Sequence, residues 1–355
     1  MTAKKHTFLL LILCTALLCC GCQNNSAGAA NTDSTKRTQI IFDYFDTATT
    51  VVGYDEDEAH FNEVCSYIEK ELARYDSLYD NYNSLTDVTS LYVVNRDAGT
   101  APVVVDEDMI RLFKLGKEIY TLTNGKTDFA MGAVFSIWHD HREEASLDPS
   151  LASVPTMEEL TEASGHCNID DIIIDEEAST IYYADPLLKC DVGAFAKGYA
   201  IERIVQDLIA MGVDHYSLNV GGNVRSIGLK PDGSKWTVAV QNPDLSYEES
   251  YSEVLSITDL ALATSGSYQR FYYVGDKKYH HIINPDTLFP EDDYLSVSVL
   301  NTDAGIGDAL STALFNMTLD EGQALVSSLS DTEAMWILAD GSKAYSDGFE
   351  AYIKK

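Results

Sequence analysis

The sequence predicts an α+β fold, with one mixed domain over residues 39–355. Segments with a helical period and short apolar or alternating strands follow one another irregularly, unlike the strict strand–helix order of a doubly wound sheet. No linker divides residues 39–355 convincingly, and no internal repeat is visible. A length of 355 residues is compatible with one large domain behind a leader.

The first 38 residues differ from the rest in composition. Lys4 and Lys5 precede an apolar run from Phe8 to Leu18, which predicts a signal peptide over residues 1–21. Gly21-Cys22 resembles the end of a bacterial lipobox, although a cysteine stands three residues before Cys22 where leucine is usual. Residues 22–38 lack large apolar side chains and are expected to form a flexible tether. We therefore expect an exported domain, anchored to the cell membrane through a lipidated Cys22; a plain secretory peptide is the alternative.

The charge balance excludes some classes of partner. The 56 Asp and Glu outnumber the 24 Lys and Arg, which gives a formal net charge of −32. Such a chain is unsuited to binding nucleic acid or to docking on anionic lipid through a basic patch. Outside the leader, Cys65, Cys167 and Cys190 have no metal-ligand spacing and indicate no disulfide framework.

The elements are predicted from periodicity and caps. The expected helices are 56–79, one capped by Asp106 and ended by Asn124-Gly125, one from the capping box Thr156-x-x-Glu159 to Gly165, 196–211, 307–317 and 321–329. The expected strands are 40–45 paired with 49–54, 172–174 paired with 181–183, 236–241, 254–258, 271–274 returning as 279–283, 295–300 and 335–338.

Residues 189–228 form the central stretch of the chain, predicted as strand, glycine turn, helix, strand and glycine turn. The loop Asp191–Gly193 enters a helix N-terminus, which favours phosphate, and Lys197 adds a full positive charge. Lys197 precedes Gly198 instead of following it, and no Ser or Thr follows, so this is not a Walker loop. An ordinary strand-to-helix connection with a solvated lysine is the other interpretation.

Two further positions carry candidate chemistry. Asp308 and Thr312 are four residues apart on a predicted apolar helix, and their oxygens suit a Mg²⁺ ion that keeps several waters. The same pair also occurs on ordinary surface helices. His281, at the predicted end of a strand, could act as a general base, or it could simply be a satisfied strand-end histidine.

Six motifs, taken together, resemble those of the ApbE-type FAD:protein FMN transferases. In order they are Thr-Asn-Gly-Lys-Thr-Asp-Phe (123–129), Asp-Val-Gly-Ala-Phe-Ala-Lys-Gly-Tyr-Ala (191–200), Asn-Val-Gly-Gly-Asn (219–223), Ala-Thr-Ser-Gly-Ser-Tyr (263–268), His-His-Ile-Ile-Asn-Pro (280–285) and Gly-Asp-Ala-Leu-Ser-Thr-Ala (307–313). The resemblance covers about residues 40 to 350.

The resemblance implies a fold, a reaction and residue roles. Members of this family use FAD and Mg²⁺, transfer FMN to a Thr or Ser hydroxyl of a partner protein, and release AMP. By similarity, the side chains of Asp308 and Thr312 and the carbonyl of Ala194 would bind the metal, and His281 would deprotonate the acceptor. The residues that would line the FAD site are Phe45, Lys126, Thr127, Asp128, Asp191, Lys197 and Ile282.

Three places depart from the family pattern. Phe45-Asp46-Thr47 replaces the usual Met-Gly-Thr, and Leu288 stands where glycine is usual. Because leucine disfavours a positive φ, we expect the turn at Leu288 to have a different shape. Residues 79–95 follow the family's serine-rich loop only loosely.

Two other functions compete with flavin transfer. The chain could hydrolyse FAD to FMN and AMP, or it could be a lipid-anchored FAD-binding protein without catalysis. The presence of Asp308, Thr312 and His281 favours transfer. No acceptor-like segment Asp-Gly-x-[Ser/Thr]-Gly-Ala-[Thr/Ser] occurs in the chain, so we expect its partners to be other proteins, flavoproteins of extracytoplasmic or membrane electron transport.

Overall fold

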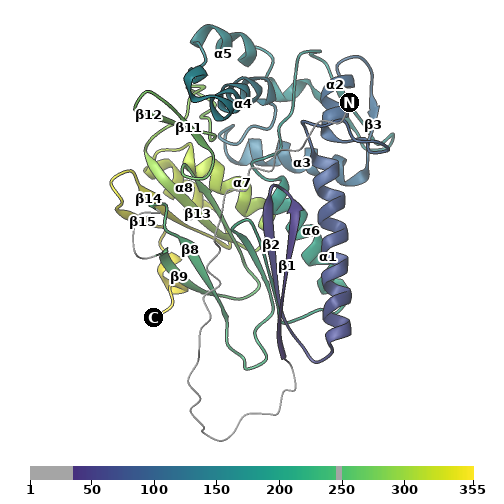
Figure 1. Ribbon diagram of the computed structural model, residues 1–355, viewed down its shortest axis with the longest axis vertical. Helices are drawn as coiled ribbons and strands as arrows, with labels where there is room; N and C mark the ends of the chain where they lie inside the picture. Colours follow the sequence, from purple (N-terminus) through teal and green to yellow (C-terminus); the bar gives the residue numbers. More distant parts are fainter. Residues whose placement is uncertain (1–34, 245–249) are drawn as a thin grey trace, which may run out of the picture. The chain divides into compact units, whose positions relative to one another are not determined.

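The computed structural model describes residues 35–244 and 250–355 (Figure 1). Its main sheet has eight strands in the order β1-β2-β6-β7-β10-β13-β14-β15, and every neighbouring pair is antiparallel. These strands are β1 (Thr35–Tyr44), β2 (Thr47–Asp55), β6 (Tyr216–Val220), β7 (Asn223–Ile227), β10 (Ala261–Gly266), β13 (Tyr294–Asn301), β14 (Thr332–Leu338) and β15 (Lys343–Tyr345).

Helices and three small sheets complete the described residues. The α-helices are α1 (Glu58–Tyr79), α2 (Leu91–Asp97), α3 (Glu107–Leu122), α4 (Gly132–Leu147), α5 (Met157–Ser164), α6 (Ala196–Ala210), α7 (Ala304–Phe315) and α8 (Leu319–Ser328). The small sheets are β3 (Val103–Val104) with β5 (Thr180–Tyr183) and β4 (Ile172–Asp175), β8 (Trp236–Gln241) with β9 (Tyr251–Ile257), and β11 (Phe271–Val274) with β12 (Lys277–His280). Short 3₁₀ helices occur at Pro149–Leu151, Ile169–Asp171 and Phe349–Tyr352.

The main sheet is covered on both faces. Successive side chains of a strand point to opposite faces. Val51 packs in one core with residues of α1 and α6, such as Ile68 and Ile201, whereas its neighbour Val52 packs in another core with Trp236 of β8. Helices therefore cover one face of the sheet, and the β8–β9 hairpin covers the other (Figure 1).

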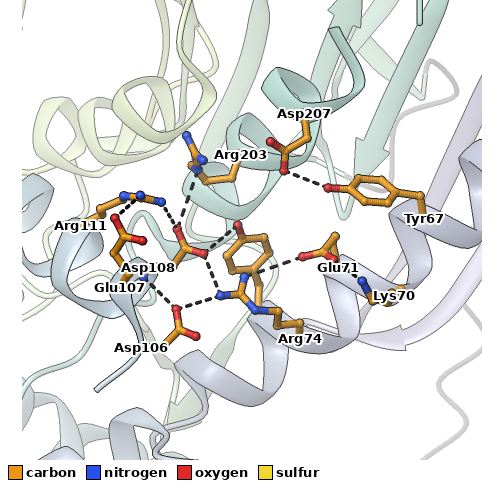
Figure 2. A network of polar contacts seen from close by, with 11 residues as sticks. Tyr67, Lys70, Glu71, Arg74, Asp106, Glu107, Asp108, Arg111, Arg203 and Asp207 are labelled. Atoms are coloured by element: carbon orange, nitrogen blue, oxygen red, sulfur yellow. Dashed lines mark hydrogen bonds and ion pairs between the residues drawn. The ribbon is translucent and has the colours of Figure 1, made fainter. Parts of the chain in front are cut away.

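A polar network ties α3 to the helices on either side of it (Figure 2). Arg74 of α1 contacts Asp106 and Asp108, each at 2.8 Å. Asp108 is buried and also contacts Arg111 at 3.0 Å and Arg203 of α6 at 3.9 Å. Because a buried carboxylate needs charged partners, this network fixes α6, the helix that follows the central glycine turn, relative to α1 and α3.

The structure confirms the α+β class and most of the predicted elements. Asp106 caps α3 by accepting from Asp108 N at 2.8 Å, and the capping box at Thr156 is present. Gly212 follows α6 with φ +83°, as expected of a left-handed C-terminal cap. Two helices were not predicted: α2, and the 16-residue α4, whose N-cap Met131 makes no side-chain capping bond and whose buried positions are few.

Two boundaries and one element need correction. β1 begins at Thr35, so residues 35–38, assigned above to the tether, pair with β2, and the Arg37 side chain contacts Glu58 at 3.1 Å. β12 ends at His280, not at residue 283. The hydroxyl-rich segment at Thr264 and Ser265, which the sequence does not mark as a strand, is part of β10.

The leader lies outside the described residues, which begin at Thr35. The signal peptide over 1–21, the lipidation at Cys22 and the tether before Thr35 therefore remain predictions. Within 35–244 and 250–355, no helix is long and apolar enough to cross a membrane.

Candidate active site

The central glycine turn leads into α6 as predicted. Asp191 accepts a hydrogen bond from its own loop, at 2.8 Å from Gly193 N, and a second from Asn81 Nδ2 at 3.0 Å. The N-cap residue of α6, Phe195, makes no side-chain capping bond. Of the first three amides of α6, that of Ala196 donates to the Val192 carbonyl at 2.8 Å and that of Gly198 to Asp308 Oδ2 at 2.8 Å. The binding of phosphate at this helix end remains a prediction, for which the Lys197 amide and side chain are the candidates.

Helix α7 meets this end of α6 at Gly198. A Cβ added to Gly198 would lie 2.2 Å from the carbonyl oxygen of Ala304 and 2.5 Å from Cβ of Asp308. The absence of a side chain at Gly198 allows its amide to donate to Oδ2 of Asp308 at 2.8 Å. Gly198 is the third residue of α6, so its amide has no partner within the helix and is available to the Asp308 carboxylate. Ala194 lies in the glycine turn, two residues before the start of α6.

The carboxylate of Asp308 is buried near amide groups, which carry partial positive charge, and near the full positive charge of Lys197. Only 7% of its surface is exposed. Burial raises the pKa of Asp308, and Lys197, Asn223 and the Gly198 amide oppose that shift. Asn223 Nδ2 is itself buried and has no hydrogen-bond partner at bonding geometry among the described residues. A cation beside Asp308 would offset the cost of burying this charge.

The donor set fits a hard cation. Asp308 and Thr312 lie one turn apart on α7, and both present oxygen. Within the described residues, no group of three or more His, Cys, Asp or Glu could hold a metal. One carboxylate, one hydroxyl and one carbonyl oxygen leave room for water and phosphate, which is the coordination that Mg²⁺ prefers.

The loop after α3 contacts α7 next to Asp308. Lys126 pairs with Asp286. Thr127 is buried, and its hydroxyl donates to the carbonyl of Ala309 at 2.9 Å, so in this structure it ties the loop to α7. Burial raises the pKa of Asp128 to about 6, although its carboxylate accepts from Ala130 N at 2.8 Å.

His281 lies directly after β12 and is exposed. Its Nδ1 lies 3.1 Å from the carbonyl oxygen of Arg270. Because a carbonyl oxygen only accepts, Nδ1 carries the hydrogen and Nε2 keeps a free lone pair. Desolvation by the surrounding protein, and then the Arg270 guanidinium, lower the pKa of His281, so the ring is neutral at neutral pH even though part of its surface meets solvent.

The β1–β2 turn reaches the same region. Phe45 has φ +53°, and its amide donates to Asp76 Oδ1 at 2.7 Å. Asp46, the unusual acidic residue of this turn, contacts Arg270 at 3.6 Å and is therefore linked to the His281 segment. Ile282 points the other way: it is 5% exposed and packs in the core against α7.

The prediction for Leu288 was wrong. Leu288 adopts φ +62°, so the turn keeps the left-handed residue that glycine would supply. Its amide donates to the Asn284 carbonyl at 2.8 Å, and its carbonyl accepts from Trp138 Nε1 at 2.9 Å. These contacts hold the leucine in a conformation that it disfavours locally.

Several residues near the site were not predicted from the sequence. Tyr82 stacks on His139 with ring centroids 4.4 Å apart. Burial raises the pKa of Tyr82, the nearby charge of Asp191 raises it further, and Arg142 and Arg270 oppose the shift, so this aromatic pair lies near the glycine turn and the His281 segment. Tyr82 lies in the loosely matching segment 79–95 and His139 in the unpredicted helix α4, so only the Tyr-Asp-Asn-Tyr-Asn run offered a signal.

Comparisons with known proteins agree with this arrangement. The model of the ApbE family matches residues 45–336. An FAD:protein FMN transferase of Treponema pallidum is 30% identical over 268 residues, which cover 72% of this chain and 72% of that protein. One of Haemophilus influenzae is 25% identical over 359 residues, covering 99% and 98%.

Solved structures give the same result. The ApbE protein of Thermotoga maritima superposes with a TM-score of 0.78 at 25% identity, over 90% of this chain and 100% of that one. The flavin transferase ApbE of Vibrio cholerae shares the fold, with a TM-score of 0.73 at 23% identity, again over 90% of this chain and 100% of the other. The chain described here belongs to the ApbE family.

Proposed function

We propose that this protein transfers FMN from FAD to a Thr or Ser hydroxyl of an acceptor protein, with Mg²⁺, and releases AMP. The observation that carries the proposal is the buried carboxylate of Asp308, held against the N-terminal turn of α6 beside Lys197. The relatives are named FAD:protein FMN transferases, which supports the transfer of FMN from FAD to a protein. A pyrophosphate is the part of FAD that such a site would bind.

Asp308, Thr312 and the Ala194 carbonyl would hold the metal. When bound, Mg²⁺ would neutralise charge on the pyrophosphate and stabilise the departing AMP. The side chain and the backbone amide of Lys197, in the first turn of α6, would bind the remaining phosphate oxygens. All of these groups come from α6, α7 and the turn before α6, so their positions depend on the contact between the two helices.

His281 would accept the acceptor's proton. Its Nε2 has the free lone pair, because Nδ1 is directed to the Arg270 carbonyl. The hydroxyl oxygen would attack the phosphorus on the FMN side as its hydrogen moves to Nε2. A bond forms between the hydroxyl oxygen and that phosphorus, and the bridging phosphorus–oxygen bond to AMP breaks. The bridging oxygen leaves with AMP, so the acceptor gains one FMN phosphodiester.

Location and partners belong to the same proposal. An exported enzyme tethered through a lipidated Cys22 would meet acceptor flavoproteins of extracytoplasmic or membrane electron transport. In the sequence, this proposal rests on the leader and on the lack of an acceptor-like segment.

The test uses the purified full chain with FAD, Mg²⁺ and a protein domain that carries the acceptor segment. We expect the acceptor to gain the mass of one FMN while AMP appears in equal amount, and both to stop with a chelator or with Asp308→Asn. Asp320→Asn on the exposed first turn of α8 is the matched control and should keep the activity. AMP without a labelled acceptor would instead identify an FAD pyrophosphatase. FAD that stays intact would identify a binding protein.

A further inference from the structure

We propose that Ser265 is a positioning residue, whose hydroxyl orients the Thr312 hydroxyl so that its lone pairs face the metal. The inference rests on the proposed metal site at Asp308 and Thr312. It concerns a strand residue that the family motif includes but to which neither the sequence nor the comparisons assign a role.

Three hydroxyl groups meet between β10 and α7. Ser265 Oγ of β10 lies 3.1 Å from Thr312 Oγ1 and 2.7 Å from Ser311 Oγ, both on α7. Ser311 is fully buried, and its hydroxyl donates to the carbonyl oxygen of Asp308 at 2.8 Å. A continuous hydrogen-bonded chain thus runs from one proposed ligand, Thr312, to the backbone of the other, Asp308.

The three hydrogen bonds among these hydroxyl groups and the Asp308 carbonyl can all form only if every donor points in the same direction along the series. Each hydroxyl has a single hydrogen, and a carbonyl oxygen can only accept. Ser311 gives its hydrogen to the Asp308 carbonyl, so the contact between Ser311 and Ser265 needs the hydrogen of Ser265. The contact between Ser265 and Thr312 then needs the hydrogen of Thr312.

This direction has a consequence for Thr312. Its hydrogen points to Ser265, so the lone pairs of Oγ1 are directed away from the strand and are free to bind a cation. Metal affinity commonly depends on residues that hydrogen-bond the metal ligands, and the loss of such a residue lowers the affinity about 10- to 100-fold. We expect Ser265→Ala to weaken Mg²⁺ binding at the lower end of that range, about tenfold.

The neighbouring residue on the same strand provides a matched control. Thr264 Oγ1 bonds Ser298 Oγ of β13 at 2.8 Å, and consecutive residues of a strand point to opposite faces. Thr264→Ala therefore removes one hydroxyl from the same strand without touching the chain to Thr312. Ser265→Thr keeps the hydroxyl and should restore Mg²⁺ affinity to within about threefold of the wild type.

The experiment measures Mg²⁺ binding in two ways on the full chain in detergent. One is the rise in melting temperature as Mg²⁺ is added, which reports binding to the folded state without turnover. The other is the Mg²⁺ concentration that gives half-maximal AMP release from FAD. Ser265→Ala should raise both half-saturating concentrations about tenfold, while the rate at saturating Mg²⁺ largely recovers. Thr264→Ala should change neither by more than about twofold.

The outcomes separate this inference from the metal site itself. If wild type responds to Mg²⁺ and Asp308→Asn does not, but Ser265→Ala binds as tightly as wild type, the role of Ser265 is refuted and the metal site stands. If wild type shows neither response, both proposals are refuted. Should Ser265→Ala fail to fold, Ser265→Cys decides: a thiol has nearly the size of the hydroxyl group but is only a weak acceptor for the Thr312 hydrogen, so a Mg²⁺ affinity equal to that of wild type would refute the role of Ser265.

Discussion

Replacing Gly198 with alanine tests whether the contact between α6 and α7 builds the site. The substitution adds one methyl group at the point where the two helices touch. That group would lie 2.2 Å from the carbonyl oxygen of Ala304 and 2.5 Å from Cβ of Asp308. Both distances are about 1 Å or more shorter than ordinary carbon contacts, so one helix must move away from the other.

The size of the effect follows from two opposing terms. Alanine is about 1 kcal/mol better than glycine within a helix. Overpacking a core that cannot yield typically costs about 1–3 kcal/mol, and here the obstacles include a backbone carbonyl. We expect a net loss of up to about 2 kcal/mol in the free energy of unfolding, or up to roughly 3 °C in melting temperature for a chain of this size. A displacement near 1 Å at the reacting groups can cost about 100-fold in rate.

Thermal unfolding and AMP release from FAD measure the two effects on the same sample. Gly165→Ala, at the end of α5, is the matched control: Gly165 has right-handed helical φ and ψ, and its added Cβ would meet only the Glu162 carbonyl, at 3.2 Å. We expect this control to keep the wild-type rate. A Gly198→Ala protein with the stability and turnover of wild type would refute the view that this contact positions Asp308.

Two further predictions concern protons. His281→Ala should lower the transfer rate about 100- to 10,000-fold with little change in the KM for FAD. Because the pKa of His281 is lowered from 6.5, the wild-type rate should stay level between pH 7 and 6; a half-loss at pH 6.5 would contradict this. Asp128→Asn should stabilise the protein at pH 8 by about 1–3 kcal/mol. The pKa of Asp128 is about 6 in the folded protein, above its ordinary value of 3.8. Between these two pH values the Asp128 carboxyl keeps its proton only in the folded wild type. The wild type therefore loses stability as the pH rises from 3.8 to about 6. The advantage of the variant should therefore vanish near pH 4, and chemical denaturation at the two pH values measures it.

Local sequence patterns were sufficient to predict the site residues that lie on helices. A 3.6-residue period with clear ends predicts α6 and α7, and their spacing puts Asp308 and Thr312 on one side of α7. Lys197 lies one residue before Gly198, whose amide bonds Asp308, so the predicted phosphate-binding turn and the predicted metal pair meet in one place.

Contacts between distant segments account for what the sequence did not predict. Ser265 bonds residues 46 and 47 positions away, and a short hydroxyl-rich segment ending in glycine does not resemble a strand on its own. Thr127 and Ile282 show the converse. Both were assigned to the FAD site by resemblance, yet burial against α7 gives each a packing role in this structure.

Leu288 shows why a local rule failed. The left-handed region costs a leucine about 1–2 kcal/mol, which by itself favours a different turn. Three hydrogen bonds oppose that cost: Leu288 N to Asn284 O at 2.8 Å, Asn284 N to Phe289 O at 2.9 Å, and Trp138 Nε1 to Leu288 O at 2.9 Å. The Trp138 ring also packs edge-on against Phe289, with centroids 5.1 Å apart. At about 1 kcal/mol for each hydrogen bond, these contacts outweigh the local cost. The turn after the His281 segment is therefore held by two hydrogen bonds of its own and by Trp138 of α4, a helix far away in the sequence, and glycine is not required to form it.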